Sequence, residues 1–159
     1  MNESHLAYLN LGSNVQPETN LPKAVKLLSK YGGIQKISSV WESEAVGTKG
    51  PNYLNACVLY KSAHSLTDLK ERVITLIETR LGRRRMEDKS APRSMDIDII
   101  LFDDQPVNDS VWELAFVVVP LADIYPEYRV VVKEETVIEI ATRLRREVWL
   151  ETRPLMLRP

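Results

Sequence analysis

The sequence predicts an α+β sandwich in which helices cover one face of a β-sheet. Segments with the two-residue alternation of strands and segments with the three- and four-residue apolar spacing of helices follow one another along the chain. Their order is strand, helix, strand, strand, helix, strand. The 159 residues, of which 44% are hydrophobic, suffice for one ordinary core. Residues 1–159 are therefore expected to form a single domain, with additions after the sixth element.

The first two elements are a strand and an amphipathic helix. Residues 6–11 are mostly apolar and indicate a buried strand that ends in a glycine-containing turn. Apolar residues at helical spacing predict a helix from about residue 20 to residue 31. Thr19 or Asn20 is the expected N-cap, and Gly32 is expected to end the helix.

Two strands and a loop follow. Residues 34–43 predict a strand with imperfect alternation, and residues 45–52 have the composition of a loop. Residues 53–61 predict a strand in which Tyr53 and Asn55 share one face, because side chains two positions apart point the same way. An aromatic ring and an amide are therefore expected on one side of the sheet.

A second helix and a further strand complete this pattern. Ser65 is expected to cap the helix, with Asp68 three residues later, and the apolar spacing continues until Gly82 ends the helix. The strand at residues 95–102 begins with Asp96 and Asp98. The complete order is the split βαβ pattern of a ferredoxin-like sandwich.

Asp96 and Asp98 are expected to point to one face of their strand, while the aliphatic residues at 97, 99 and 101 point to the other. Two like charges at this spacing are costly unless a cation lies between them. A hard divalent cation that also holds a polyphosphate suits them. Because helices cover one face of such a sheet, the acid pair, Tyr53 and Asn55 are expected together on the open face.

The last third of the chain is expected to add peripheral elements. Residues 114–124 form an apolar run that fits either a strand or a helix, and Pro120 does not decide between them. A short strand at residues 129–132 and a helix at residues 134–146 are expected, the helix with acidic residues first and arginines last. Residues 147–159 are expected to be an appended tail.

Composition limits the classes of protein to consider. The formal net charge of −1 argues against general attraction to nucleic acid or to an anionic membrane. Cys57 is the only cysteine, so no intrachain disulfide can form. No run approaches the roughly 18 apolar residues that would span a bilayer. A cytoplasmic protein without nucleic-acid or membrane partners is expected.

Three segments, YLNLGSN, PNYLNACV and above all KSAPRSMDIDIILF, are similar to the 6-hydroxymethyl-7,8-dihydropterin pyrophosphokinases of folate biosynthesis. Residues 89–100 satisfy every position of that family's motif, and the similarity extends from about residue 6 to residue 127. Members of the family transfer the β,γ-diphosphoryl unit of ATP to the pterin hydroxymethyl oxygen and release AMP. The resemblance therefore implies an enzyme with two small-molecule substrates, ATP being the co-substrate.

The resemblance also implies roles for individual residues. Asp96 and Asp98 would hold two Mg²⁺ ions that bridge the ATP phosphates. The pterin would stack on Tyr53, meet the amide of Asn55 and have Phe116 on its other face. The residues implied for the nucleotide site or for the loop that closes over it are Glu78, Arg83, Arg85 and Arg93. The three arginines would act in catalysis, and Glu78 and Arg93 would bind the nucleotide.

Two departures from the family pattern leave alternatives open. Ser90 stands where the family usually has an aromatic residue, and a segment with a Pro-His pair and an arginine that touch the phosphates is missing after the acidic strand. Trp112 lies at the shortened place and could replace a lost contact. One alternative is a divergent relative that binds a pterin or nucleotide with weak, altered or no transfer. Another is a nucleic-acid-binding module, although carboxylates on the open face would repel a phosphate backbone.

Overall fold

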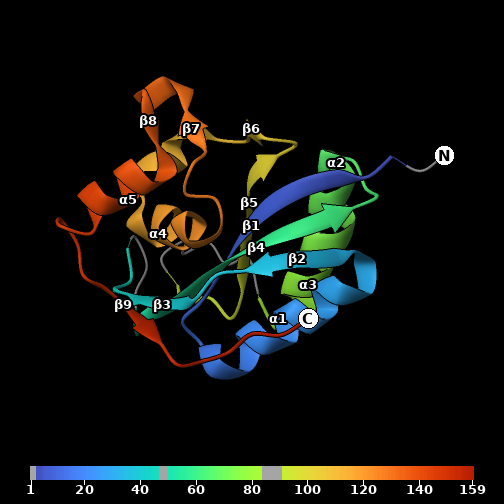
Figure 1. Cartoon of the computed structure of the whole chain (residues 1–159). Coiled ribbons are helices and arrows are strands. Elements are labelled where there is room, and N and C mark those ends of the chain that lie inside the picture. The colour runs from blue at the N-terminus through green and yellow to red at the C-terminus, as the bar shows by residue number, and fades with distance from the viewer. Residues whose placement is uncertain (1–2, 47–49, 84–90) are drawn as a thin grey trace.

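The computed structural model of the chain describes residues 3–46, 50–83 and 91–159. Its main sheet has seven strands, and helices lie against both faces (Figure 1). The strands are β1 (His5–Ser13), β2 (Gly33–Ile37), β3 (Val40–Ser43), β4 (Tyr53–Ser62), β5 (Asp96–Phe102), β6 (Gln105–Pro106), β7 (Arg129–Val130), β8 (Glu135–Thr136) and β9 (Leu150–Arg153). The helices are α1 (Pro17–Tyr31), α2 (Leu66–Asp68), α3 (Thr75–Arg80), α4 (Ala115–Ile124) and α5 (Val137–Leu144).

The strand order of the main sheet is β6-β5-β1-β4-β3-β9, and β2 also pairs with β4. Strand β1 lies between β4 and β5 and is antiparallel to both. Strands β7 and β8 form a separate two-stranded sheet. The predicted α+β ferredoxin-like order of the first six elements is confirmed, and it places the acidic strand β5 next to β1.

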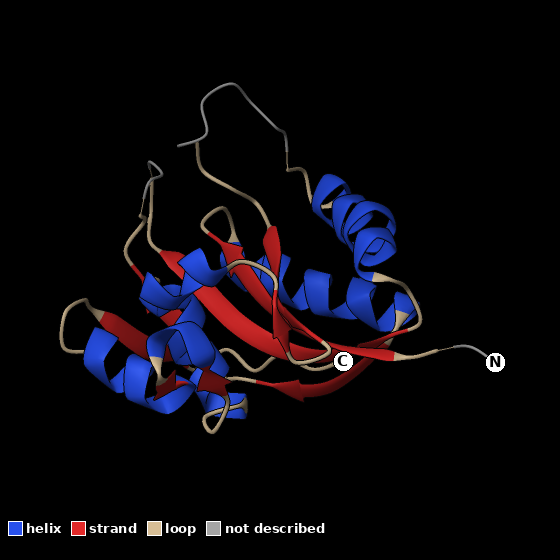
Figure 2. Ribbon diagram, turned by 90° about the horizontal axis from the view of Figure 1, so that it is seen from above, coloured by secondary structure: helices blue, strands red, loops and turns tan. Residues whose placement is uncertain are grey.

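Each face of the sheet has its own apolar core, and the two groups of helices lie on opposite sides of the strands (Figure 2). Helices α1, α2 and α3 cover one face. The apolar run at residues 114–124 forms α4, which lies with α5 on part of the other face. A helix that is apolar nearly all round is stable only when it is buried on most sides. The second face is therefore only partly open, which corrects the expectation of helices on one face alone.

The first helix begins earlier than the sequence predicts. It starts at Pro17, after Gln16 in the left-handed region with φ of 43°, and no side chain caps its first turn. Proline suits this position because its missing N–H would have no partner in the first turn. Asn20 donates instead from Nδ2 to the carbonyl of Val15 at 2.6 Å. The expected cap at Thr19 or Asn20 is therefore wrong.

The strand predicted at residues 34–43 is interrupted and forms β2 and β3. Ser38 exchanges backbone and side-chain hydrogen bonds with Cys57: its N–H donates to the Cys57 carbonyl, and its Oγ accepts from the Cys57 N–H. The hydroxyl takes the place of a ladder carbonyl, so the regular pairing with β4 stops there. Side-chain bonds of this kind explain why the alternation is imperfect.

The helix after Ser65 contains a wider turn. Ser65 caps it as predicted, accepting from the Asp68 N–H at 3.2 Å. Between α2 and α3 the chain forms a π-helical turn at Leu69–Ile74, and the hydroxyl of Thr75 donates to the carbonyl of Lys70 at 2.9 Å. The extra residue in the turn adds Ile74 and Glu78 to the buried side of the helix.

Strand β5 contains a register shift opposite Tyr8 and Leu9. Leu9 pairs with Ile99, whereas Tyr8 pairs with Leu101, so Ile100 is an extra residue. A bulge of this kind turns the following side chains to the other face. Leu101 therefore lies in the core beside Tyr8, on the same side of the sheet as the acid pair. The predicted alternation holds at residues 96–99 and is wrong for Leu101.

The last residues of the chain are part of the sheet. Residues 150–153 form β9, which pairs with β3 (Figure 1), and Leu155 and Leu157 pack against the same apolar core as α1. Helix α5 begins at Val137, because Thr136 and Glu139 form a capping box. The expectation of an appended tail at residues 147–159 is wrong. None of the helices in the described part of the chain is long and apolar enough to cross a bilayer.

Candidate active site

The floor of the candidate site is formed by three neighbouring strands. In one row across the sheet, Asp98 of β5 lies opposite Asn10 of β1, which lies opposite Cys57 of β4. In the next row on the same face, Asp96 lies opposite Gly12, and Gly12 lies opposite Asn55. The alternation of side chains therefore brings the predicted acid pair and the predicted amide onto one face.

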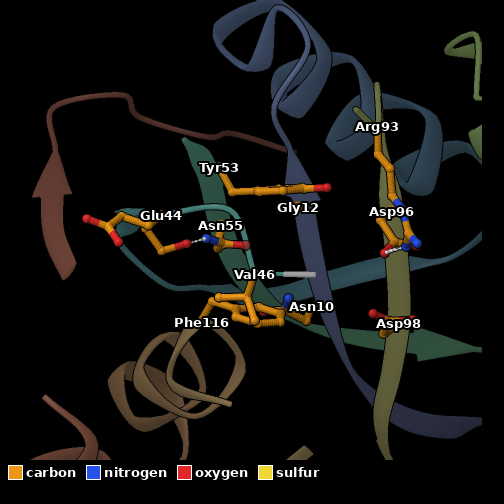
Figure 3. A pocket seen from close by; sticks show the side chains of 11 residues that line it. Asn10, Gly12, Glu44, Val46, Tyr53, Asn55, Arg93, Asp96, Asp98 and Phe116 are labelled. Carbon is orange, nitrogen blue, oxygen red and sulfur yellow. Dashed lines mark hydrogen bonds and ion pairs between the residues drawn. The ribbon is translucent and has the colours of Figure 1, made fainter. Parts of the chain in front are cut away.

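A hollow of about 130 Å³ opens above this floor, and Figure 3 shows its side chains. We call it the central hollow. Its lining residues are Asn10, Gly12, Ser43, Glu44, Val46, Tyr53, Asn55, Arg93, Asp96, Asp98 and Phe116. Six of the residues predicted from the sequence thus meet at one place. The acidic strand forms one end of the hollow, and Tyr53 and Phe116 lie toward the other end.

The aromatic end of the central hollow has a fixed amide. The NH₂ group of Asn55 donates to Ser43 Oγ at 2.8 Å, and Asn55 is buried. This bond fixes the direction of the amide and leaves Oδ1 on the side of Gly12. A Cβ added at Gly12 would lie 3.0 Å from Asn55 Oδ1 and 3.6 Å from the ring of Tyr53. Only glycine leaves this part of the floor open.

Two arginines hold Asp96 at the other end. Arg83 donates from one nitrogen to Glu78 at 2.8 Å and to Asp96 Oδ1 at 3.0 Å. Arg93 donates to Asp96 Oδ2 at 2.7 Å, as Figure 3 shows. Both carboxylate oxygens of Asp96 are therefore paired with cations in the ligand-free protein.

Glu78 is buried next to this cluster and does not line the central hollow. Its carboxylate accepts from the backbone N–H of Ile97 at 2.9 Å as well as from Arg83. Burial raises the pKa of Glu78, and these two donors act in the opposite direction. The residue thus joins α3, Arg83 and β5 at the point where the acid pair begins.

Asp98 lacks such partners. It forms no hydrogen bond or ion pair with any described residue, although its side chain reaches solvent. Desolvation by the surrounding protein, followed by the charges of Asp96 and Glu78, raises the pKa of Asp98 from 3.8 to about 6. A cation bound next to Asp98 would therefore stabilise its charged form.

A second hollow, of about 620 Å³, lies on the other side of Asp98; we call it the neighbouring hollow. Its lining residues are Leu66, Thr67, Lys70, Glu71, Ile74, Ile97, Asp98, Ile99, Val107, Asn108, Ser110, Val111 and Leu114. The lining thus combines apolar side chains with amide, hydroxyl and charged groups. Asp98 lines both hollows, so ligands in the two would meet at the acidic strand.

The described residues fit a divalent cation only in part. Asp96 and Asp98 present hard oxygen atoms on one face, and the raised pKa of Asp98 reflects an excess of negative charge there. Within the described ranges, however, no group of three or more acidic, His or Cys side chains is placed to hold a metal. Mg²⁺ commonly uses one or two carboxylates and completes its shell with phosphate oxygens and water. The acid pair is suited to that kind of site.

Three residues singled out from the sequence are either outside the described ranges or away from the two hollows. Arg85 and Ser90 belong to residues 84–90, which the structure does not describe. Trp112 is fully buried in the core with α4 and α5, where its Nε1 donates to Asp109 at 2.9 Å. It lines neither hollow, so it does not replace a contact of the shortened segment.

Sequence reasoning did not single out five residues that line the central hollow: Asn10, Gly12, Ser43, Glu44 and Val46. Asn10 and Gly12 could have been found from the sequence. They lie on alternate positions of a predicted strand, and placing that strand beside the acidic strand would have put them next to the acid pair. Glu44 and Val46 follow β3 in a loop, whose position has no periodic signal.

The fold and the site define a ferredoxin-like α+β protein with a hollow that has charged side chains at one end and aromatic side chains at the other, a combination that suits a small molecule. A family model described as 7,8-dihydro-6-hydroxymethylpterin-pyrophosphokinase (HPPK) matches residues 8–126. The chain is 33% identical over 137 residues to 2-amino-4-hydroxy-6-hydroxymethyldihydropteridine pyrophosphokinase of Synechocystis sp., covering 79% of this chain and 69% of that protein. It is 35% identical over 133 residues to the Bacillus subtilis protein of the same name, with 76% and 78% covered.

Solved structures agree on the fold. The wild-type HPPK-DHPS of Plasmodium falciparum with SDX-DHP matches with a TM-score of 0.73 at 15% sequence identity. The match covers 92% of this chain and 46% of that one, so our chain spans less than half of the longer protein. The chain belongs to the 7,8-dihydro-6-hydroxymethylpterin-pyrophosphokinase family.

Proposed function

We propose that the protein transfers the β,γ-diphosphoryl unit of ATP to 6-hydroxymethyl-7,8-dihydropterin and releases AMP. The observation that carries the proposal is the central hollow, which joins an aromatic end to the acid pair within a chain of this family. A planar ring at the aromatic end would direct its substituent toward Asp96 and Asp98. The reaction belongs to folate biosynthesis, as the names of the relatives indicate.

The acceptor is assigned to the central hollow. Tyr53 and Phe116 offer apolar rings for the two faces of a pterin, and flat heterocycles are bound well between such rings. Asn55 is held by Ser43, so its amide is oriented before the ligand arrives. An amide of fixed direction reads the polar edge of the ring without losing rotational freedom on binding.

The nucleotide is assigned to the neighbouring hollow. Its apolar wall suits the adenine ring, and its shared boundary at Asp98 directs the polyphosphate to the acid pair. Arg83 and Arg93 lie beside Asp96 and provide positive charge at that boundary. Arg85 keeps its role of phosphate ligand as a prediction from the family motif.

Asp96 and Asp98 would hold Mg²⁺ ions, expected to be two, which neutralise phosphate charge when they are bound. The chain itself positions the reactants. The hydroxymethyl oxygen bonds to the β-phosphorus while the bond from that phosphorus to the α,β-bridging oxygen breaks. AMP leaves with the bridging oxygen, and the hydroxyl proton goes to solvent. Arg83 and Arg93 stabilise the charge on the transferred group.

We propose that the protein is cytoplasmic. Its single cysteine, Cys57, is buried and free, which suits a reducing compartment. The substrates of the proposed reaction are small molecules.

Turnover of the purified protein tests the proposed function. With ATP, Mg²⁺ and the pterin, we expect equal amounts of AMP and pterin diphosphate to accumulate. Asp96→Asn and Asp98→Asn should each reduce the rate at least about a hundredfold, because each removes a charge at the developing phosphate centre. Asp68→Asn, at a half-buried position of α2 away from the acid pair, is the matched control and should keep the full rate. Absence of both products with the unmodified protein would refute the proposal.

A further inference from the structure

Asn10 is a buried polar residue on the floor of the central hollow, and nothing assigned so far uses it. Only 3% of the residue is exposed. Its Oδ1 is enclosed and has no hydrogen-bond partner among the described residues, and its NH₂ group donates to none of them. Most buried side-chain polar atoms in proteins have at least one hydrogen-bond partner, so an amide oxygen without one requires an explanation.

The position of Asn10 is set by the sheet. It lies in β1 opposite Asp98 of β5 on one side and opposite Cys57 of β4 on the other. Figure 3 shows it between Phe116 and the acidic strand, on the side of the sheet that faces the hollow. Asn55 is one row further along the floor. The two amides therefore face different parts of any ring held in the hollow.

The amide of Asn10 is free to adapt. Its terminal torsion has a broad, roughly two-fold preference, so it can turn either its oxygen or its NH₂ group toward the hollow. No bond to a described residue opposes this rotation, in contrast to Asn55, which Ser43 holds. An apolar side chain of the same shape would avoid the cost of an unpaired buried amide. A polar residue here is thus unfavourable in the empty protein.

We propose that Asn10 is an additional acceptor-binding residue. Its amide hydrogen-bonds the polar edge of the ring next to the hydroxymethyl group, the part of the acceptor nearest to Asp98. This inference rests on the proposed function, because it takes the central hollow as the site of the pterin. Asn10 then fixes the reacting end of the ring, while Asn55 reads the other end. The acceptor is held at both ends between Tyr53 and Phe116.

Two substitutions separate binding from folding. Asn10→Ala removes the amide without adding bulk, and Asn10→Leu replaces it with an apolar group of similar shape. Calorimetric titration with the pterin is expected to show a fivefold to tenfold loss of affinity for both variants, in the range of one lost hydrogen bond. The KM for the pterin should rise by a similar factor, while the KM for ATP stays unchanged. Asn10→Leu should resist urea at least as well as the unmodified protein.

Cys57→Ala is the matched control, because Cys57 lies next to Asn10 on the same face but does not line the hollow. It should bind the pterin like the unmodified protein. Pterin affinity within twofold of the unmodified protein for Asn10→Ala would overturn the assignment of Asn10 and leave the proposed function intact. If the unmodified protein binds no pterin, the proposed function fails, and the contact of Asn10 with the acceptor fails with it.

Discussion

Asp96 and Asp98 lie two positions apart on one strand and differ in their ion-pair partners. Asp96 has an arginine on each oxygen, at 3.0 and 2.7 Å. Asp98 has no such partner among the described residues, and its pKa is raised to about 6. A carboxylate with its pKa raised in this way reduces the stability of the ligand-free protein at neutral pH, and a cation bound beside it would remove that cost.

Asp98→Asn is expected to stabilise the ligand-free protein. The pKa of Asp98 is higher in the folded chain than in the unfolded chain, so the folded state binds more protons between about pH 4 and pH 6. Stability is therefore lost as the pH rises through this window, and above it the charged form carries the full cost. Because the side chain reaches solvent, we expect the variant to gain about 1 kcal/mol at pH 8.

Urea unfolding of both proteins at pH 8 and pH 4 measures this effect. The difference in the free energy of unfolding between Asp98→Asn and the unmodified protein should shrink toward zero at pH 4, because Asp98 in the folded chain is then neutral, as asparagine is. A variant that is less stable than the unmodified protein at pH 8 would contradict the account of Asp98.

At the scale of elements, Glu78 ties α3 to the start of β5. Its buried carboxylate accepts from the Ile97 N–H and from Arg83, which in turn binds Asp96. The π-helical turn at Leu69–Ile74 puts Glu78 on the buried side of the helix. A small irregularity in one helix therefore sets the position of an arginine in the candidate site.

Glu78→Ala is expected to destabilise the protein by about 2–3 kcal/mol, because it leaves a backbone N–H and a guanidinium without their buried acceptor. Thr79→Ala, at the exposed neighbouring position, should change stability by less than about 0.5 kcal/mol. Chemical unfolding of the two variants makes the comparison. Equal stability of Glu78→Ala and Thr79→Ala would show that the carboxylate of Glu78 does not hold α3 against β5.

The short connection between β6 and α4 is anchored by Trp112, which is fully buried. Trp112→Ala should reduce stability by about 3–5 kcal/mol through the cavity it leaves. Where the variant is still folded, the KM for ATP should be unchanged, because the ring lines neither hollow. Trp149→Ala, at a 40% exposed position, is the control and should lose much less stability. A KM for ATP that rises tenfold would instead place Trp112 at the nucleotide.

The elements differ in how far the sequence predicts them. Alternation predicted the shared face of Tyr53 and Asn55, because it depends only on neighbours along one strand. The bulge at Ile100 and the break at Ser38 depend on the partner strand, which is distant in sequence. Similarly, the spacing of the helix did not predict the contact of Glu78 with β5, since the π-helical turn changes the buried side.

At the scale of the whole molecule, the additions after β5 make the site. Helix α4 covers part of the second face of the sheet and supplies Phe116, which turns an open surface into a walled hollow. Strand β9 extends the sheet beyond β3. The ferredoxin-like core thus provides the acid pair and the two amides, and the C-terminal elements supply the wall that a ring requires.

Phosphorus NMR of the reaction tests the central claim most directly, because it identifies which phosphoryl unit moves. With ATP, Mg²⁺ and 6-hydroxymethyl-7,8-dihydropterin, we expect AMP and a pterin diphosphate to appear in equal amounts, with no ADP. ADP together with a pterin monophosphate, or ATP that stays intact in the presence of the pterin, would contradict the proposed diphosphoryl transfer.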